Sequence, residues 1–274
     1  MRVYLSVDME GVAGISHPGP TDRGDELYPA AVELMTGEAN AAIEGALAGG
    51  AEAVVVNDSH GSMFNLSPAR LHPDARLVQG QKPLSMVEAA ADGRYDVCLY
   101  VGYHARAGHP RGTIAHTYSG RATLTTLNGR PVGEYGINAL YLGALGVPVG
   151  LVAGDDALAE EVAEWLPWAE RVVVKRAVGG NAADSLHPER ARGLIRAGAQ
   201  RAVEKARAGE LQPLRLEPPI RLGIEFRRPV EADFAAVLPG LERGGDRGVR
   251  FESDDPIGVY RAFVAAIRLA GLVE

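Results

Sequence analysis

Short apolar runs alternate with longer helical patterns along the first two thirds of this 274-residue chain. The runs have the length of β-strands, and they are apolar throughout, which is typical of strands buried inside a sheet. This alternation predicts an α/β fold in which a mostly parallel sheet is flanked by helices. The expected strands are residues 3–7, 53–56, 96–102, 149–153 and 171–175.

Two helices and one hairpin are also expected between these strands. One helix covers residues 36–47, where Thr36 can cap its start and Gly49 with Gly50 can end it. The other covers residues 133–145. In residues 122–132 the pair Asn128-Gly129 separates two extended runs, and this pair is a strong signal for a tight β-hairpin.

The sequence changes in character after residue 180. A long helix rich in Arg and Ala comes first, followed by the proline-rich residues 211–219. A strand at 220–226 and a last helix at 255–270 complete the chain. We therefore expect a catalytic α/β domain in residues 1–180 and a smaller C-terminal α+β domain or cap in residues 181–274.

Charge and hydropathy exclude several classes of function. The formal net charge is -7, which argues against nucleic acid as the main ligand because phosphate binding needs a basic surface. No apolar run approaches the roughly 20 residues of a membrane span, and the N-terminus has no signal-peptide pattern. The single cysteine, Cys98, lies in an apolar run, where we expect it to be buried and reduced. We expect a cytoplasmic protein without a membrane partner.

Side chains of the types that bind metals follow the expected strands. Asp8 and Glu10 come after the first strand, His60 after the second and His104 after the third, and Glu134 begins a helix. A histidine or carboxylate alone at such a place is more often structural. Because open α/β sheets form their sites at the carboxyl ends of the strands, we expect these side chains to converge.

The donor set favours a pair of metal ions. Carboxylates and imidazoles suit zinc, which keeps an open coordination position when it is catalytic. Three anionic ligands with one bridging hydroxide balance two divalent cations, whereas a single cation would leave buried negative charge in excess. Two such ions lower the pKa of bound water to near 7 and polarise a carbonyl, so the sequence predicts a metal-dependent hydrolase with two Zn²⁺ per subunit.

Several blocks of this sequence, in order, resemble the bacterial zinc D-aminopeptidases of the dipeptide-permease operon type. The resemblance covers most of the chain and fades after about residue 180. It rests on residues 6–11, 56–60, 71–73, 85–88, 102–106, 115–116, 130–134 and 152–156.

The resemblance implies a role for each candidate residue. Asp8 would bridge two zinc ions, Glu10 and His60 would complete one site, and His104 and Glu134 would complete the other. The resemblance adds His116 as a catalytic histidine, which would move a proton or stabilise the tetrahedral intermediate. It also implies a ring-shaped homodecamer, and short peptides with an N-terminal D-amino acid as substrates.

Two alternatives remain open from the sequence. The same metal cluster would serve a dizinc L-aminopeptidase or an amidase, since it determines the reaction type better than the stereochemistry. A catalytically silent binding or assembly protein with this fold is the other. The acceptor for the substrate amine is also open among Asp58, Asp155 and Asp156. By contrast, His72, His109 and His187 adjoin prolines and are interpreted as loop residues.

Overall fold

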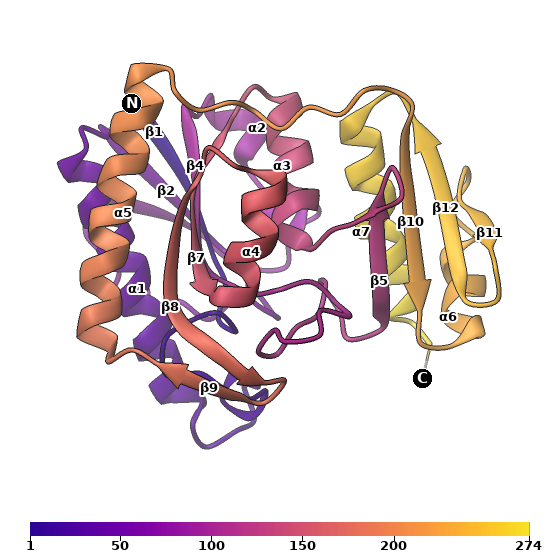
Figure 1. Cartoon of the computed structure of the whole chain (residues 1–274), viewed down its shortest axis with the longest axis horizontal. Coiled ribbons are helices and arrows are strands. Elements are labelled where there is room, and N and C mark those ends of the chain that lie inside the picture. Colours follow the sequence, from indigo (N-terminus) through magenta and orange to yellow (C-terminus); the bar gives the residue numbers. More distant parts are fainter. Residues whose placement is uncertain (274) are drawn as a thin grey trace.

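The computed structural model describes residues 1–273 and contains two β-sheets (Figure 1). The larger sheet has seven strands in the order β3-β2-β1-β4-β7-β8-β9, and all neighbours are parallel except β8 and β9. This arrangement confirms the predicted α/β fold with a mostly parallel sheet. Its strands are β1 (Arg2–Val7), β2 (Ala53–Asp58), β3 (Ala75–Val78), β4 (Val97–Tyr103), β7 (Val149–Asp155), β8 (Glu170–Gly179) and β9 (Ala182–Ser185).

Helices cover both faces of this sheet. On one face, α1 (Tyr28–Ala48) packs against α5 (Pro188–Ala208), and their apolar residues share a core with Val3, Leu5 and Val7. On the other face lie the short α2 (Ala90–Gly93), α3 (Glu134–Ala144) and α4 (Asp156–Trp165), whose core includes Tyr4. Alternate residues of β1 thus enter two different cores, which explains why the strand is apolar throughout.

The second sheet is antiparallel and has the order β11-β12-β10-β5-β6. Its strands are β5 (Ala122–Leu127), β6 (Arg130–Pro131), β10 (Ile220–Phe226), β11 (Glu242–Gly244) and β12 (Gly248–Ser253). The hairpin prediction is confirmed, since Asn128 and Gly129 both have positive φ, at 49° and 78°. The hairpin joins the second sheet, beside a strand almost 100 residues later in the chain.

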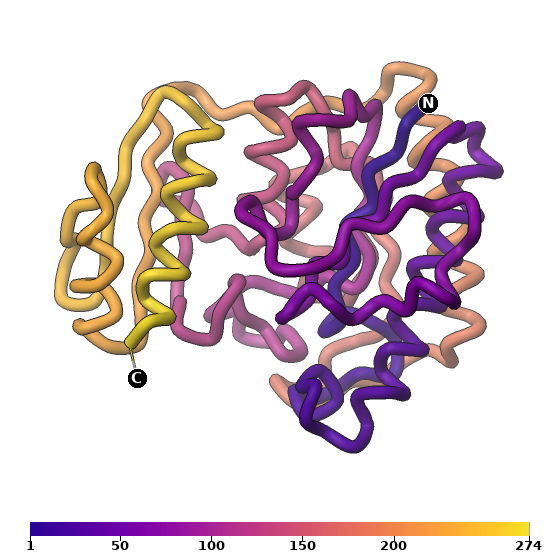
Figure 2. Tube along the Cα trace, turned by 180° about the vertical axis from the view of Figure 1, so that it is seen from behind, coloured from indigo at the N-terminus to yellow at the C-terminus, as the bar shows by residue number. Residues whose placement is uncertain are grey.

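Helix α7 (Pro256–Ala270) lies between the five-stranded sheet and the rest of the molecule, as Figures 1 and 2 show from opposite sides. It packs against α3 and against the short α6 (Pro229–Ala235), and its Tyr260 and Phe263 are buried in the core that α3 shares. The division at residue 180 stays a prediction about domain organisation; in space, α5 covers the first sheet, and β5 belongs to the second.

Two short 3₁₀ helices, η1 (Gly19–Thr21) and η2 (Ser85–Val87), lie in connections near the carboxyl ends of β1 and β2. One expectation about a helix start is wrong. Helix α1 begins two turns before Thr36, with Pro29 in its first turn, and Thr36 is buried inside the helix rather than capping it. Across residues 1–273, every helix is too short or too polar to cross a membrane.

The strand order reverses direction between β1 and β4. From β1 the chain builds outward through β2 to β3, and it then returns to add β4, β7 and β8 on the other side. Such a switch point opens a crevice at the carboxyl ends of the two central strands. The residues that follow β1, β2 and β4 are therefore brought to one place.

Two glycines allow the chain after β1 to lie directly against the end of β4. The Gly11 N–H donates to the Gly102 carbonyl at 2.8 Å. Gly102 has φ +72°, and a Cβ there would overlap the Asp8 carbonyl oxygen; a Cβ on Gly11 would overlap the Tyr103 carbonyl oxygen. Larger residues would push the two segments apart.

Candidate metal centre

The five expected ligand residues lie together at the switch point. Asp8 and Glu10 follow β1, His60 follows β2, His104 follows β4, and Glu134 is the first residue of α3. Each is buried, with at most 7% of its surface exposed. The convergence expected from strand ends is therefore present in space.

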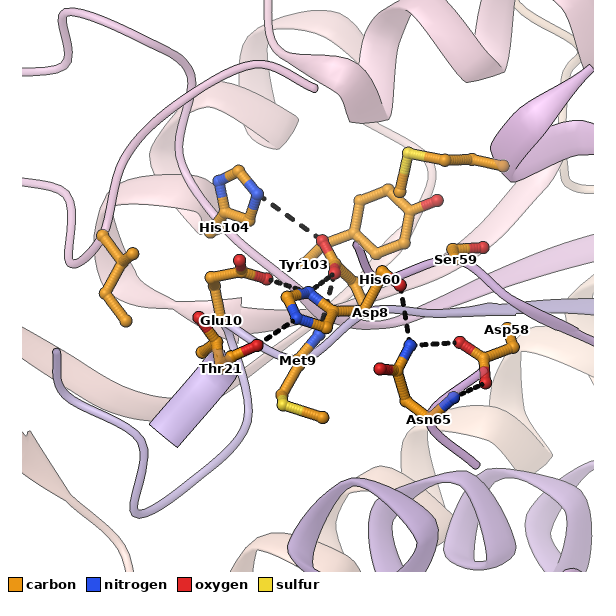
Figure 3. Close-up of polar contacts among 12 residues, drawn as sticks. Asp8, Met9, Glu10, Thr21, Asp58, Ser59, His60, Asn65, Tyr103 and His104 are labelled. Atoms are coloured by element: carbon orange, nitrogen blue, oxygen red, sulfur yellow. Dashed lines mark hydrogen bonds and ion pairs between the residues drawn. The ribbon is translucent and has the colours of Figure 1, made fainter. Parts of the chain in front are cut away.

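His60 faces two carboxylates (Figure 3). Its Nδ1 lies 3.2 Å from Asp8 Oδ1 and 2.9 Å from Glu10 Oε2. On the opposite side of the ring, Nε2 lies 2.9 Å from the Thr21 carbonyl oxygen, to which it can only donate. The neutral ring therefore directs the lone pair of Nδ1 at the carboxylates, an arrangement that a cation between them stabilises.

His104 has the same relationship to a second pair of carboxylates. Its Nε2 lies 3.5 Å from Asp8 Oδ2 and 3.2 Å from Glu134 Oε1. Neither approach has the direction of a hydrogen bond, so within residues 1–273 this buried nitrogen has no hydrogen-bond partner. Its Nδ1 donates to the Ala105 carbonyl at 3.0 Å, so in the neutral ring that a metal ion requires the lone pair lies on Nε2.

Asp8 lies between these two halves of the cluster. One carboxylate oxygen faces His60 and the other faces His104. The same side chain accepts the Met9 backbone N–H at 2.8 Å, which orients it. A carboxylate placed in this way is suited to bridge two cations.

The carboxylates change the protonation of the imidazoles around them. Burial alone lowers the pKa of a histidine, yet the charge of Glu10 raises the pKa of His60 well above its usual value. Against the same effect of burial, Glu134 raises the pKa of His104 to about 10. In return, although burial opposes it, His104 lowers the pKa of Glu134 to about 2. The cluster thus attracts positive charge strongly.

His116 lies next to the cluster rather than inside it. Its Nε2 is 4.0 Å from Glu10 Oε1, and its Nδ1 donates to the Ile114 carbonyl at 2.9 Å. Burial, followed by the neighbouring His104, lowers its pKa, so its ring is neutral at pH 7. Nε2 therefore carries a lone pair beside the carboxylates.

The donor atoms fit a metal centre. Ligand atoms of Asp8, Glu10 and His104 all lie within 4.8 Å of one another, and so do those of His104, His116 and Glu134. Oxygen and nitrogen donors in this mixture suit zinc. His104 Nε2 is a buried polar atom without a hydrogen-bond partner among residues 1–273. Such atoms are uncommon unless they bind an ion or a water molecule, so this nitrogen also indicates a metal site.

The three aspartates considered for the substrate amine have structural contacts. The Asp58 carboxylate accepts the backbone N–H groups of Asn65 and Leu66, at 2.6 and 2.7 Å (Figure 3). Asp155 caps α4 and accepts the N–H of Thr113, and Asp156 accepts that of Ala177. All three stabilise loops around the site.

Two residues that support the cluster were not predicted from the sequence. The backbone N–H of Tyr118 donates to Glu134 Oε2 at 2.8 Å. Lys175 is buried, and its Nζ donates to the carbonyls of Glu10, Val12 and Ile15. The available signal for the Lys175 contacts was a lysine directly after the apolar run of residues 172–174.

A pocket of about 740 Å³ opens beside the cluster. Asp8, Glu10, His60, His116 and Glu134 line it. Its other walls come from the segment of residues 81–86 and from the last two turns of α7. The volume is within the usual range of small-molecule sites.

Comparison with known proteins gives three matches. The family model described as D-aminopeptidase, peptidase family M55, matches residues 1–265. A D-aminopeptidase of Bacillus subtilis (strain 168) is 38% identical, and the match covers 98% of each chain. The solved structure of the Zn-dependent D-aminopeptidase DppA from Bacillus subtilis, described as a self-compartmentalizing protease, superimposes with a TM-score of 0.93. It is 36% identical, and the match covers 100% of this chain and 99% of that one.

Proposed function

Because the chain belongs to the D-aminopeptidase family of metallopeptidases, we propose that it hydrolyses the first peptide bond of short peptides bearing an N-terminal D-amino acid. The observation that carries this proposal is the buried cluster of three carboxylates and two imidazoles. Within it, His104 Nε2 lies beside Asp8 and Glu134 but lacks a hydrogen-bond partner among residues 1–273. The adjoining pocket gives a peptide access to the cluster.

In this proposal the cluster holds two zinc ions per subunit. Asp8 would be a ligand of both ions, Glu10 and His60 would complete one site, and His104 and Glu134 would complete the other. The support is the orientation of the side chains: the two oxygens of Asp8 face different histidines, and each histidine turns its acceptor nitrogen inward. The zinc ions would lower the pKa of a water and polarise the scissile carbonyl.

His116 is the proposed proton carrier. Its neutral Nε2 lines the pocket beside Glu10, so it can take a proton from the attacking water and deliver one to the leaving amine. The hydrogen bond from its Nδ1 to the Ile114 carbonyl holds the ring in the tautomer that this role requires. The substrate amine would be held at the metal cluster itself, since Asp58, Asp155 and Asp156 are engaged elsewhere.

A direct test measures metal content and hydrolysis together. Elemental analysis of the purified protein should give two zinc ions per chain, and a chelator should abolish hydrolysis of D-alanyl dipeptides until zinc is returned. Faster cleavage of the matched L-alanyl peptides would contradict the D preference. Less than one tightly bound ion together with chelator-insensitive hydrolysis would contradict the metal centre itself.

We also propose a homodecameric ring that encloses the active sites, in the cytoplasm. The support is the similarity over the whole chain to a protease described as self-compartmentalizing. Exposed apolar side chains are available for subunit contacts, among them Val178 and Val237, at 72% and 75% exposure. The free, buried thiol of Cys98 agrees with a reducing compartment. Light scattering on the eluted protein would give the number of subunits.

A further inference from the structure

The pocket has a negative part and a positive part. Its three carboxylates are the cluster residues Asp8, Glu10 and Glu134. Apart from the histidines, the cationic side chains that line it are Lys82 and Arg268. Residues 81–86 and α7 contribute these two cations, whereas the carboxylates follow β1 and begin α3. Charges of opposite sign therefore line different walls of one cavity.

The side chains of Lys82 and Arg268 both donate hydrogen bonds to backbone carbonyl groups, which are neutral. Lys82 is only 6% exposed, and its Nζ donates to the Asp58 carbonyl at 2.5 Å. The Arg268 guanidinium donates to the Lys82 carbonyl. Both acceptors are backbone oxygens, and among residues 1–273 neither cation forms an ion pair with a carboxylate. The bond to Asp58 uses one of the three N–H groups of the ammonium.

Burying a cation without an anionic partner is unfavourable. Burial lowers the pKa of Lys82 to about 8, and the charges of Asp58 and Glu88, which are not in contact with its ammonium group, oppose this effect only in part. The side chain is still largely protonated at neutral pH. An anionic group of a ligand would offset this cost. A carboxylate is a suitable partner, since ammonium and guanidinium groups both form charge-assisted hydrogen bonds with it.

We propose that Lys82 and Arg268 bind the C-terminal carboxylate of the substrate. This inference rests on the proposed aminopeptidase function and narrows it to dipeptides and tripeptides with a free carboxyl terminus. The N-terminal end of such a peptide faces the metal cluster, where its first peptide bond is cut, and its other end faces the two cations. The apolar side chains of Met63, Met86 and Ile267 line the same cavity, where they would contact the substrate side chains. A cavity of about 740 Å³ suits a ligand of this size.

The test compares D-alanyl-D-alanine with its C-terminal amide in the zinc-loaded protein. We expect kcat/KM to be at least tenfold higher for the free acid, because the amide should have a higher KM and a similar kcat. Arg268→Gln and Lys82→Met should each bring the ratio of the two kcat/KM values towards 1. The control is Arg261→Gln, which removes an exposed arginine of the same helix that does not line the pocket. It should keep the ratio of the unaltered protein.

Calorimetric titration of the His116→Ala variant with the same two compounds measures binding without turnover. The free acid should bind at least tenfold more tightly than the amide, and adding Arg268→Gln should remove most of that difference. Equal hydrolysis and equal binding of acid and amide would overturn the inference while leaving the aminopeptidase function intact. If the protein hydrolysed neither D-alanine p-nitroanilide nor either of the two dipeptides, the proposed function itself would be overturned. Arg268 is exposed, so its variant keeps the test valid if Lys82→Met does not fold.

Discussion

The imidazole rings of His104 and His116 stack face to face, with centroids 4.0 Å apart and planes inclined by 14°. Two rings this close do not both carry a positive charge readily, and their pKa values are displaced in opposite directions: the carboxylate of Glu134 overcomes burial and raises that of His104, while burial and His104 lower that of His116. The two histidines are therefore suited to different roles. His104 points into the carboxylate cluster as a proposed metal ligand, whereas His116 stays neutral beside it as the proposed proton carrier.

Replacing His116 by alanine should stop turnover without removing metal. The loss of a proton carrier is expected to lower kcat by about 10² to 10⁴, while elemental analysis still finds the zinc content of the unaltered protein. His109→Ala is the control, because His109 is a half-buried loop residue outside the cluster. A fully active His116→Ala variant would show that the proposed role is wrong.

Replacing Glu134 by alanine should remove metal as well as activity. Glu134 lies 3.2 Å from His104 Nε2 and contributes one of the three carboxylates of the cluster. Its removal is expected to lower zinc content to about one ion per chain, with activity lost in parallel. If the variant retained two ions and normal activity, Glu134 could not be a ligand.

Asp58 should prove to be a structural residue rather than the site of the substrate amine. Its carboxylate accepts the N–H groups of Asn65 and Leu66 and the amide of Gln79, and these contacts shape the loop that follows His60. Asp58→Ala leaves these donors without an acceptor. We therefore expect the free energy of unfolding, measured in urea, to fall by about 3 kcal/mol, and zinc binding to weaken. A variant of normal stability with a raised KM alone would favour amine binding instead.

Gly102→Ala should destabilise the protein more than a positive φ alone explains. Gly102 and Gly129 have similar backbone angles, φ +72° and +78°, but only at Gly102 would the added methyl group overlap a backbone oxygen, that of Asp8. Gly129→Ala should therefore cost about 1 kcal/mol, and Gly102→Ala at least about 2 kcal/mol more, with reduced zinc content. Urea unfolding of both variants checks this, and equal losses would contradict the close approach.

Glu38 should make stability depend on pH. Burial raises its pKa from an ordinary value of 4.5 to about 7, and its carboxyl group accepts the Ala13 N–H at 2.9 Å. Between these two values the folded state holds a proton that the unfolded state has released. The contribution of Glu38 is therefore full below pH 4.5 and is lost as pH rises through 7, by about 3 kcal/mol in total.

Glu38→Gln keeps an acceptor for Ala13 but does not ionise. The difference in unfolding free energy between the unaltered protein and this variant should shift by about 3 kcal/mol between pH 5 and pH 8, in the direction that favours the variant at pH 8. Measuring both proteins in chelator removes the contribution of metal binding. A difference that does not change with pH would show that Glu38 has an ordinary pKa.

Strands β1, β2, β4 and β7 were predictable because they are buried on both faces and lie between helical patterns. The edge strands β3 and β9 were not expected, since they are short and only partly buried. The start of α1 was not, since Thr36 resembles a cap in sequence although the apolar residues of the helix continue back to Ala31. Strand β11 was missed for a different reason: two of its three residues are exposed, and it has no apolar pattern. Its place depends on pairing with β12, which is a tertiary contact.

The cluster was predictable for a related reason. Parallel strands end at one edge of a sheet, so ligand-type residues at several strand ends converge whatever their spacing in the chain. Lys82 and Arg268 have no such signal, because 186 residues separate them and their meeting depends on how α7 packs. Lys175 is similar, since its three carbonyl partners lie in a loop some 160 residues earlier.

The position of α7 has a consequence for the order in which the molecule becomes functional during synthesis. The residues of the cluster have all been translated by residue 134, but Val264, Ile267 and Arg268, which form one wall of the pocket, follow about 130 residues later. The metal ligands and this wall of the pocket are therefore synthesised at different times, and a peptide pocket with all its walls requires the chain to be translated as far as α7.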